Sequence, residues 1–309
     1  MENSTITSFG EVLWDMLPDR SVLGGAPFNF TYRARSLGND AVLVSRVGSD
    51  ELGTRALEQM RMLGIPTDYI QLDLEHTTGK VRVTFDESKN PSYIIIEDVA
   101  YDYIEYNDNL AFRIQDSDCI CFGSLIQRTE NSRRTLYTLL DYFQGAYTLF
   151  DINLRQNCYS RETIESSLGR TNVLKLNEDE LRELKVMFGL SGDTIQDISS
   201  LLTETYGLTY CLVTLGDKGV YAVSDRNEEV YVPAFQVDLV DPVGSGDGCA
   251  AGFIDALLGG ETLAYACRFA AAVGAVVAEQ SGATEPLDRG QVEEMLGREG
   301  TAAPHPEFA

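Results

Sequence analysis

Residues 241–248 read Asp-Pro-Val-Gly-Ser-Gly-Asp-Gly, and Cys-Ala-Ala-Gly-Phe continues the chain at 249–253. The run predicts a glycine turn that leads into a helix, with Asp247 on the first helical turn. Amides at a helix start lack intrahelical partners and lie at the positive end of the helix dipole. The amides of Gly244, Ser245, Gly246 and Asp247 can therefore hold a transferring phosphoryl group. A carboxylate that only lined such a pocket would repel phosphate, so Asp247 fits best as a general base that faces an attacking hydroxyl.

The same run of residues allows other interpretations. An ordinary helix start, in which Asp247 only stabilises the dipole, stays open on the sequence alone. A dinucleotide fingerprint fits less well, because its third small position falls on Cys249 and Asp247 would face pyrophosphate. A P-loop is excluded, because Gly79-Lys80 is followed by Val81 and Leu74 stands where the first glycine is required.

The composition limits the partners of this chain. Its 309 residues are 44% hydrophobic, which supports a large core, and its 24 basic against 48 acidic residues give a net charge of −24. Such a surface repels nucleic acid and anionic membranes. An ATP site must then be made positive locally, by helix N-termini, a few basic side chains and Mg²⁺.

Cysteine and histidine usage narrows the chemistry further. The six cysteines show no C-x-x-C pairing and mostly lie in apolar runs, so we expect reduced core thiols. Because we find neither a leader-like N-terminus nor an apolar run of about 18 residues, we expect a cytoplasmic protein. Only two histidines occur, so carboxylates must carry any proton chemistry.

Strand-like and helical runs alternate along most of the chain. Such alternation predicts βαβ units and a mostly parallel sheet with helices on both faces. The predicted strands and the helices that follow them are 41–47 and 51–63, 118–122 and 132–143, 147–152 and 161–168, 173–176 and 178–188, then a helix near 194–206 and a strand at 210–214.

Residues 80–85 and 92–97 depart from this alternation. They interleave polar and apolar side chains and predict an antiparallel hairpin, either a small sheet over a cleft or an edge hairpin of the main sheet. A second hairpin is expected near 219–232. The domain is expected to span 1–299, with lid strands inserted from about 11–23 and 78–106, and residues 300–309, with two prolines, are expected to form a frayed, flexible tail.

Gly24-Gly25-Ala26-Pro27-Phe28-Asn29 predicts a tight turn into a helix. As a structural feature, this turn needs no further explanation. Functionally, Gly25 would let a ligand approach the backbone and Asn29 would offer a sugar hydroxyl both a donor and an acceptor. Asp15, near the end of the first strand, could accept from another hydroxyl.

Asn177 to Glu180 (Asn-Glu-Asp-Glu) has the spacing of a capping box at a helix start. Its position after a predicted parallel strand also allows it to order water around Mg²⁺.

Thr214 to Gly219 (Thr-Leu-Gly-Asp-Lys-Gly) ends another strand in a turn. If a nucleotide lies there, Thr214, Gly216 and Gly219 would contact it and Lys218 would approach phosphate. Arg155, after the strand that ends at Asp151, could steady a phosphate or sugar oxygen, or could pair with Asp151.

In this order the segments resemble the ribokinase-like (PfkB) carbohydrate kinases, from Gly10 to about Pro286. The resemblance rests on four motifs, which are Gly24-Gly25 with Asn29, Val47-Gly48-x-Asp50-x-x-Gly53, Asn177-x-x-Glu180 and Asp241-x-Val243-Gly244-Ser245-Gly246-Asp247. It implies a ribokinase-like α/β fold with a small β-sheet lid, and ATP-dependent phosphorylation of a sugar hydroxyl.

The resemblance also implies a role for each site. Asp247 would be the base, with the amides of residues 244–247 as anion hole. The sugar would lie against Asp15, Gly25 and Asn29. The nucleotide side would consist of Asn177, Thr214, Gly216, Gly219 and Gly246, with Mg²⁺ reached through water from Asn177 and Glu180. A monovalent cation such as K⁺ would lie near Asp241, Val243 and Gly282, and the lid would pair two subunits into a homodimer.

Within the family, residues 10–15, 24–30, 99–102 and 122–125 look most like bacterial fructokinases. Two positions depart from the family's usual pattern. Pro242 replaces a threonine, which puts a cation contact from that side chain in doubt, and Ser245 replaces an alanine without removing a backbone donor.

We therefore expect a fructokinase that makes fructose 6-phosphate. Kinases for ribose, 2-keto-3-deoxygluconate or a nucleoside are the alternatives within the family. A catalytically inactive sugar-binding regulator is the alternative from another class, and it is disfavoured because Asp247 and its glycines are present.

Overall fold

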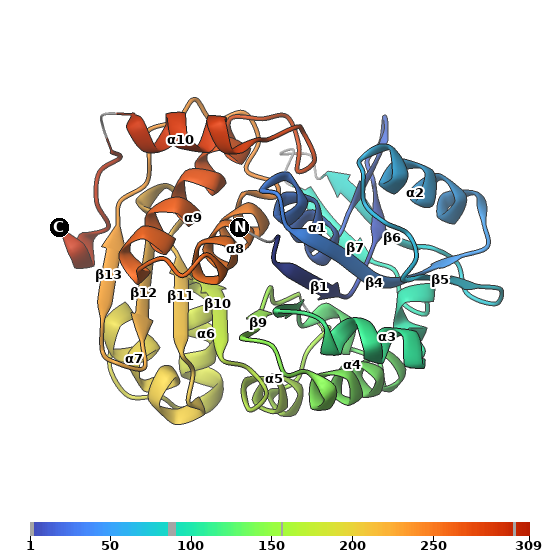
Figure 1. Ribbon diagram of the computed structural model, residues 1–309, viewed down its shortest axis with the longest axis horizontal. Coiled ribbons are helices and arrows are strands. Elements are labelled where there is room, and N and C mark those ends of the chain that lie inside the picture. The colour runs from blue at the N-terminus through green and yellow to red at the C-terminus, as the bar shows by residue number, and fades with distance from the viewer. Residues whose placement is uncertain (1–2, 86–90, 156, 299–300) are drawn as a thin grey trace.

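The computed structural model, which describes residues 3–85, 91–155, 157–298 and 301–309, arranges these residues around a nine-stranded sheet (Figure 1). Its strands pair in parallel except at β11–β12 and β12–β13, which are antiparallel. In spatial order they are β13 (Glu229–Val232), β12 (Val220–Ser224), β11 (Tyr210–Thr214), β10 (Val173–Asn177), β9 (Tyr147–Asp151), β8 (Cys119–Phe122), β1 (Thr5–Phe9), β4 (Asp40–Gly48) and β5 (Ile70–Asp73). The predicted mostly parallel α/β sheet and the hairpin near 219–232 are confirmed.

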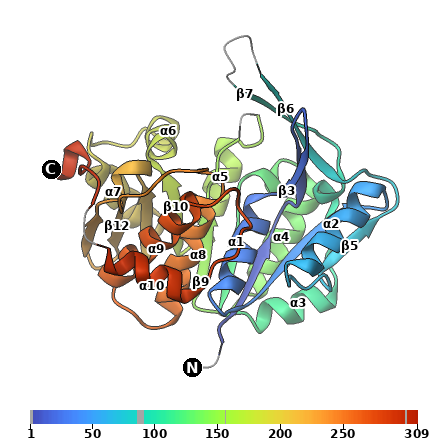
Figure 2. The same cartoon turned by 90° about the horizontal axis from the view of Figure 1, so that it is seen from above.

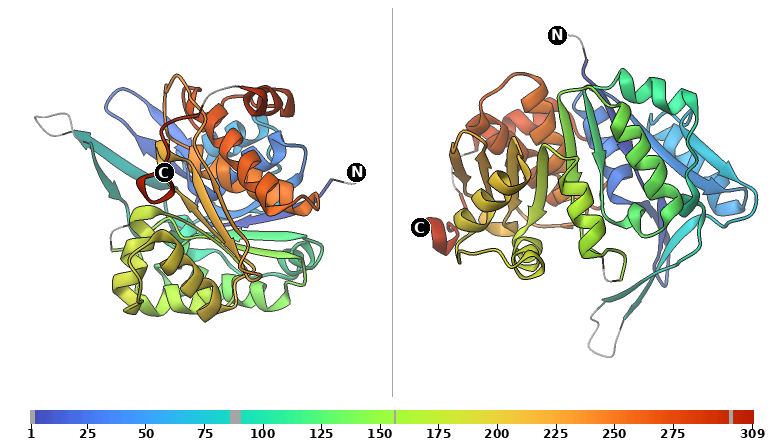
Figure 3. Two further views of the ribbon diagram at one scale, coloured as in Figure 1. Left: turned by 90° about the vertical axis from the view of Figure 1, so that its left-hand side faces the viewer. Right: turned by 90° about the horizontal axis from the view of Figure 1, so that it is seen from below.

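Helices cover both faces of this sheet, as predicted (Figures 1 and 3). One layer holds α1 (Ala26–Ser36), α2 (Glu51–Met62), α8 (Ser245–Leu258), α9 (Leu263–Ala278) and α10 (Arg289–Gly297). The other holds α3 (Asp108–Gln115), α4 (Glu130–Tyr142), α5 (Arg161–Leu168), α6 (Glu178–Phe188) and α7 (Ile195–Tyr206). Short 3₁₀ turns complete the elements, namely η1 (Ala100–Tyr103), η2 (Leu125–Gln127), η3 (Gly216–Lys218) and η4 (Pro306–Phe308).

The strands at the centre of the sheet are apolar on both faces, because each face is covered by helices. All four residues of β8 are buried, for example. Their side chains alternate between two cores, one under α4 to α7 and one under α1, α8 and α9. Parallel pairing brings the carboxyl ends of β1, β9, β10 and β11 to one edge of the sheet, where folds of this class bind ligands.

A separate four-stranded sheet projects from this edge (Figure 2). Its order is β3 (Ser21–Gly24), β2 (Leu13–Met16), β6 (Gly79–Phe85) and β7 (Pro91–Ile95). The predicted hairpin therefore belongs to a separate small sheet, which is called the lid below, and the alternative of an edge hairpin on the main sheet is wrong. Residues 86–90, at its turn, lie outside the described residues. Residues 99–104 do not continue the lid, because Val99, Tyr101 and Ile104 are buried in the main core.

Asp50 connects the lid to the main sheet. Its carboxylate caps α2 by accepting from the Gly53 amide at 2.8 Å, and it also accepts from the amide and the hydroxyl of Thr78, at 2.9 and 2.6 Å. A Cβ at position 53 would lie 1.9 Å from the carbonyl oxygen of Gly48, so only glycine fits there. The early glycine loop of the resemblance is thus a joint at the base of β6.

The prediction of a frayed tail is wrong for residues 301–309, because these residues pack against the rest of the chain. Thr301 bridges Phe235, and the ring of Phe308 stacks on Tyr231 and Tyr221 with centroids 4.4 and 5.1 Å apart. His305 is buried. The prolines and alanines of this segment suggested disorder, but one aromatic anchor provides the apolar contact that orders it.

Across the described part of the chain, no helix is both long enough and apolar enough to cross a bilayer.

The tail contact predicts a loss of stability in Phe308→Ala. We expect the free energy of unfolding to fall by about 1 to 2 kcal/mol, less than for a fully buried ring, because Phe308 is half-buried. Urea unfolding followed by circular dichroism measures it, with Phe112→Ala as control, because that ring is 66% exposed. Equal stability of the two variants would contradict the packed tail.

Candidate active site

The first turn of α8 lies at the carboxyl edge of the sheet. Its N-cap, Gly244, has φ 82°, and a Cβ there would lie 2.5 Å from the Cβ of Ala283, so this turn requires glycine. The amide of Ser245 donates to the Pro242 carbonyl oxygen at 3.2 Å. Among the described residues, the amides of Gly246 and Asp247 have no backbone acceptor. Two adjacent amides at the positive end of α8 are therefore free for an anion, whereas the predicted Ser245 amide is already engaged.

Asp247 meets Asn29 across the site. The Asn29 amide Nδ2 donates to Asp247 Oδ2 at 2.8 Å, although 218 residues separate the two. The other polar atom of this amide, Asn29 Oδ1, is buried and has no partner among the described residues. Gly25, the N-cap of α1, brings the backbone close, because a Cβ there would lie 2.5 Å from the Glu11 carbonyl oxygen.

Asp15 and Arg155 lie on the same side of the site. Asp15, on β2, is half-buried, and burial raises the pKa of its carboxyl while Arg155 lowers it. Arg155 also lowers the pKa of Asp247 and of Glu11, so these charged groups lie near one another, and Asn29 joins them through its hydrogen bond to Asp247. Within the described chain Arg155 is exposed and forms no ion pair.

The alternative in which Arg155 pairs with Asp151 is wrong. The Asp151 carboxylate instead accepts from Lys175 Nζ at 2.9 and 3.0 Å, from the neighbouring strand. Both side chains are buried. Sequence reasoning missed Lys175, and the available signal was a lysine inside the apolar run Val-Leu-Lys-Leu at 173–176.

Burial raises the pKa of the Asp247 carboxyl to about 6, and the nearby Asp151 carboxylate adds to the rise. Lys175, the hydrogen bond from Asn29 and Arg155 oppose it. A carboxylate with this pKa is ionised at neutral pH yet basic enough to accept a proton in a transition state. This proton affinity is in the range of a general base, and the role of Asp247 as the base stays a prediction.

Glu11 is a second residue that the sequence analysis missed. It follows β1, is 3% exposed, and its Oε2 has no partner among the described residues. Burial raises the pKa of its carboxyl to about 7, Asp247 adds to this, and the amides of Glu11 and Ala26 together with Arg155 oppose it. Glu11 and Asp247 are thus two interacting carboxyl groups in one site.

The predicted nucleotide residues lie side by side. Asn177 at the end of β10 pairs in register with Thr214 at the end of β11. Asn177 and Glu180 form the predicted capping box, and the second oxygen of Glu180 accepts from the Leu154 amide at 2.8 Å. Both Glu180 oxygens are thus engaged, and the described residues contain no cluster of three metal-ligating side chains. Because both Glu180 oxygens already accept from backbone amides, this carboxylate fits the water shell of a Mg²⁺ that arrives with a nucleotide better than it fits direct binding of the ion.

The turn after β11 is closely packed. Gly216 has φ 58°, and a Cβ at Gly219 would lie 2.0 Å from the Val232 carbonyl oxygen. Lys218 pairs on the surface with Asp217 at 3.1 Å, while its carbonyl oxygen accepts from Tyr231. Its approach to phosphate stays a prediction.

The residues predicted for a monovalent cation lie in two neighbouring loops. The Val243 amide donates to Asp241 Oδ1 at 3.0 Å, and Gly282 has φ 105° beside Ala283, which contacts Gly244. Their role in cation binding stays a prediction.

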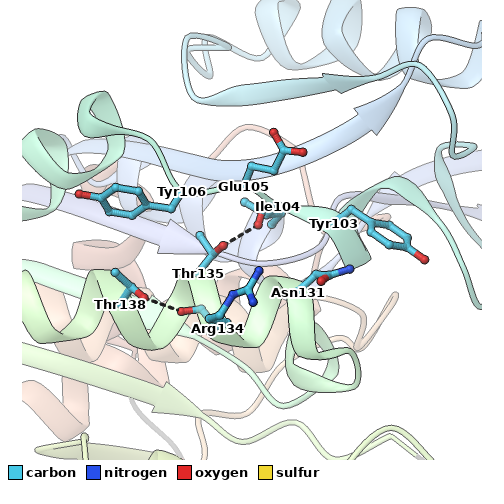
Figure 4. A pocket seen from close by; sticks show the side chains of 8 residues that line it. All are labelled: Tyr103, Ile104, Glu105, Tyr106, Asn131, Arg134, Thr135 and Thr138. Atoms are coloured by element: carbon cyan, nitrogen blue, oxygen red, sulfur yellow. Dashed lines mark hydrogen bonds between the residues drawn. The ribbon is translucent and has the colours of Figure 1, made fainter.

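A cavity of about 560 Å³ lies elsewhere, between residues 103–106 and α4 (Figure 4). Arg134 and Thr138 line it, and Thr135 donates to the Ile104 carbonyl oxygen at 2.7 Å. No residue predicted for the site lines this cavity.

Comparison with known proteins gives one family. The model of the pfkB family carbohydrate kinases matches residues 18–289. The chain is 27% identical to an ATP-dependent 6-phosphofructokinase of Thermoanaerobacterium thermosaccharolyticum, over 91% of this chain and 90% of that one. It is 26% identical to a fructokinase of Solanum tuberosum, over 93% of each chain. The fold is similar to that of a Xylella fastidiosa fructokinase with bound ATP, with a TM-score of 0.83 and 21% identity over 94% of this chain and 98% of that one.

The raised pKa of Glu11 predicts a pH-dependent loss of stability. The folded protein keeps the proton up to a pH of about 7, whereas the unfolded chain releases it near 4.5, so wild-type stability falls as the pH rises between these values. We expect Glu11→Gln to be close to wild type at pH 4.5 and more stable by up to about 3 kcal/mol at pH 8.

Urea unfolding at both pH values measures this difference, with Glu58→Gln on the exposed face of α2 as control. A difference between Glu11→Gln and wild type that does not change with pH would contradict the assignment.

Proposed function

Because the chain belongs to the pfkB family of carbohydrate kinases, and is thus a phosphotransferase with an alcohol group as acceptor, we propose that it phosphorylates fructose with ATP. The product would be fructose 6-phosphate. The observation that carries the mechanism is the Asn29–Asp247 hydrogen bond beside the free amides of Gly246 and Asp247.

Asp247 accepts the proton of the attacking hydroxyl as the new O–P bond forms. Asn29 fixes the carboxylate by binding Oδ2 and leaves Oδ1 of Asp247 to face the substrate. The free amides of the α8 start face the negative charge of the migrating phosphoryl group. Proton transfer and charge stabilisation are thus placed on one helical turn.

The sugar is held by groups that have no partner among the residues that the structure describes. Asn29 Oδ1 is buried without a donor, and an unsatisfied buried acceptor costs about 1 to 3 kcal/mol, so a sugar hydroxyl there is favoured. Asp15 accepts from a second hydroxyl, and Gly25 lets the ring approach the backbone. Arg155 steadies a sugar or phosphate oxygen from the exposed side.

The nucleotide side is formed by Asn177, Thr214, Gly216 and Gly219, with Gly246 at the phosphates. Mg²⁺, when bound with ATP, neutralises phosphate charge. Asn177 and Glu180 reach it through water, and Lys218 adds a positive charge near the phosphates. Asp241, Val243 and Gly282 provide oxygens for a monovalent cation such as K⁺.

The lid closes over the sugar and joins two copies into a homodimer. Val22 and Ile94 on the lid are 38% and 50% exposed, which provides apolar surface for such pairing. The described structure places all six cysteines as buried free thiols, and this supports a reducing, cytoplasmic location.

A second substrate class is favoured by one observation. Arg155 is exposed and forms no ion pair in the described residues, so it could bind the carboxylate of 2-keto-3-deoxygluconate or the phosphate of a sugar phosphate. The similarity to a 6-phosphofructokinase is consistent with the latter.

Replacing the base predicts a specific kinetic loss. We expect Asp247→Asn to lower kcat by about 10² or more, because the proton acceptor is lost while sugar and ATP still bind. Coupled ADP-release kinetics with calorimetric binding of both ligands measure it. Asp141→Asn, with the same change of charge on an exposed part of α4, is the control. Near-normal kcat in Asp247→Asn would place the base elsewhere.

The substrate is decided by ADP release across fructose, ribose, 2-keto-3-deoxygluconate, fructose 6-phosphate, glucose and adenosine. We expect kcat/KM to be highest for fructose, and by about tenfold or more over ribose, because a few hydrogen bonds distinguish the two. Equal kcat/KM for ribose and fructose would reject the fructose assignment. Preference for an anionic substrate would support the alternative, and Arg155→Ala should then abolish that preference.

A further inference from the structure

A buried ion pair lies directly beneath the start of α8. Lys175 on β10 and Asp151 at the end of β9 are opposite each other in register, with Nζ 2.9 and 3.0 Å from the two carboxylate oxygens. Their side chains are only 9% and 8% exposed. A Cβ on Gly246 would lie 3.3 Å from Lys175 Nζ, so the ammonium group underlies the residue next to Asp247.

Stability alone does not account for this pair. A buried ion pair loses hydration that its mutual attraction often fails to repay, and apolar residues of similar volume commonly serve as well. The neighbours on the same face, Leu149 and Val173, belong to the apolar core under α8 and α9. Two charges in that core, at the edge where the site forms, point to a functional role.

The charges that face Asp247 come from several elements. They are Asp151 on β9, Lys175 on β10, Arg155 after β9, Glu11 after β1 and Arg33 on α1, with the thiol of Cys121 on β8. Among these charges Asp151 has the largest effect, and it raises the pKa of Asp247, whereas Lys175 lowers it. Burial opposes the charge on Lys175, but the carboxylates of Asp151, Asp247 and Glu180 outweigh it and keep its pKa raised.

We propose that Asp151 and Lys175 are positioning residues for phosphoryl transfer, in which the buried pair holds two opposed charges beneath the first turn of α8 and the ammonium supports the Gly246 turn that faces the phosphoryl group. This proposal rests on the proposed role of Asp247 as base. Asp151 acts by its charge on Asp247, and Lys175 keeps that charge balanced.

The pair makes an unusual prediction for single substitutions, because its two members act on Asp247 with opposite sign. Asp151→Asn removes the raising charge and leaves Lys175 cationic, so the acid limb of the kcat profile should move to lower pH. Lys175→Met leaves the carboxylate of Asp151 unbalanced, so the limb should move to higher pH. We expect shifts of about half a pH unit or more.

A merely structural role would not produce opposite shifts. The two variants would then lose stability and activity together, with the acid limb unchanged. The measurement is kcat against pH from 5 to 8 with saturating ATP and sugar, with thermal unfolding at each pH as a check on folding. Shifts in the same direction, or none, would overturn the proposal.

A double variant covers the case in which single variants fail to fold. Asp151→Leu with Lys175→Met replaces the pair by apolar side chains and should fold. We expect its unfolding temperature near that of wild type and its kcat lower by about tenfold or more, with the KM for sugar little changed. Wild-type kcat and an unchanged acid limb in this folded variant would overturn the proposal.

Failure of the base assignment gives a different result. If Asp247→Asn keeps near-normal kcat, or if wild type shows no acid limb, the role of Asp247 is wrong and the inference falls with it. If Asp247→Asn is inactive and the wild-type limb is present but does not move in Asp151→Asn, only the inference about the ion pair is wrong.

Discussion

The hydrogen bond from Asn29 to Asp247 joins two segments that lie 218 residues apart in the sequence. It requires α1 and α8 to start at the same edge of the sheet, which the parallel pairing of β1 with its neighbours provides. It also requires Gly25 and Gly244 at the two helix starts, because a Cβ at either would strike the backbone or side chain opposite. A carboxylate held by an amide, next to two free backbone donors, is the arrangement on which the proposed chemistry depends.

Much of this could be predicted from the sequence, because it is encoded in local patterns. The alternation of strands and helices predicted the parallel sheet, and the interleaved residues of 80–85 and 92–97 predicted a hairpin without deciding which sheet it joins. The capping box at Asn177 and the helix start at Asp247 were visible because turn and cap residues have strong positional preferences. The family resemblance implied roles for Asn29 and Asp247 but not their hydrogen bond, since spacing alone does not place residues 218 apart in contact.

The residues that were missed are those whose role arises from tertiary packing. Lys175 had no predicted role, and its partner Asp151 was considered only as a partner of Arg155. The order of the strands, which brings Lys175 and Asp151 together, is not a local property of the sequence. Glu11 appeared only as part of a motif, since its isolation from water depends on helices from distant segments. The tail was misjudged for the same reason, as the rings that receive Phe308 lie some 80 residues upstream. The electrostatic interactions of the site thus depend on residues that are distant in the sequence.

The packing of residues 301–309 couples two parts of the molecule that the chain order keeps apart. The Tyr231 hydroxyl donates to the Lys218 carbonyl oxygen and accepts from the His305 amide, and the His305 ring contacts Glu178 at the start of α6. The turn after β11 and the first turn of α6 are thus braced by one short segment from outside the sheet. Motion of that segment would be transmitted to both of them through side-chain contacts alone.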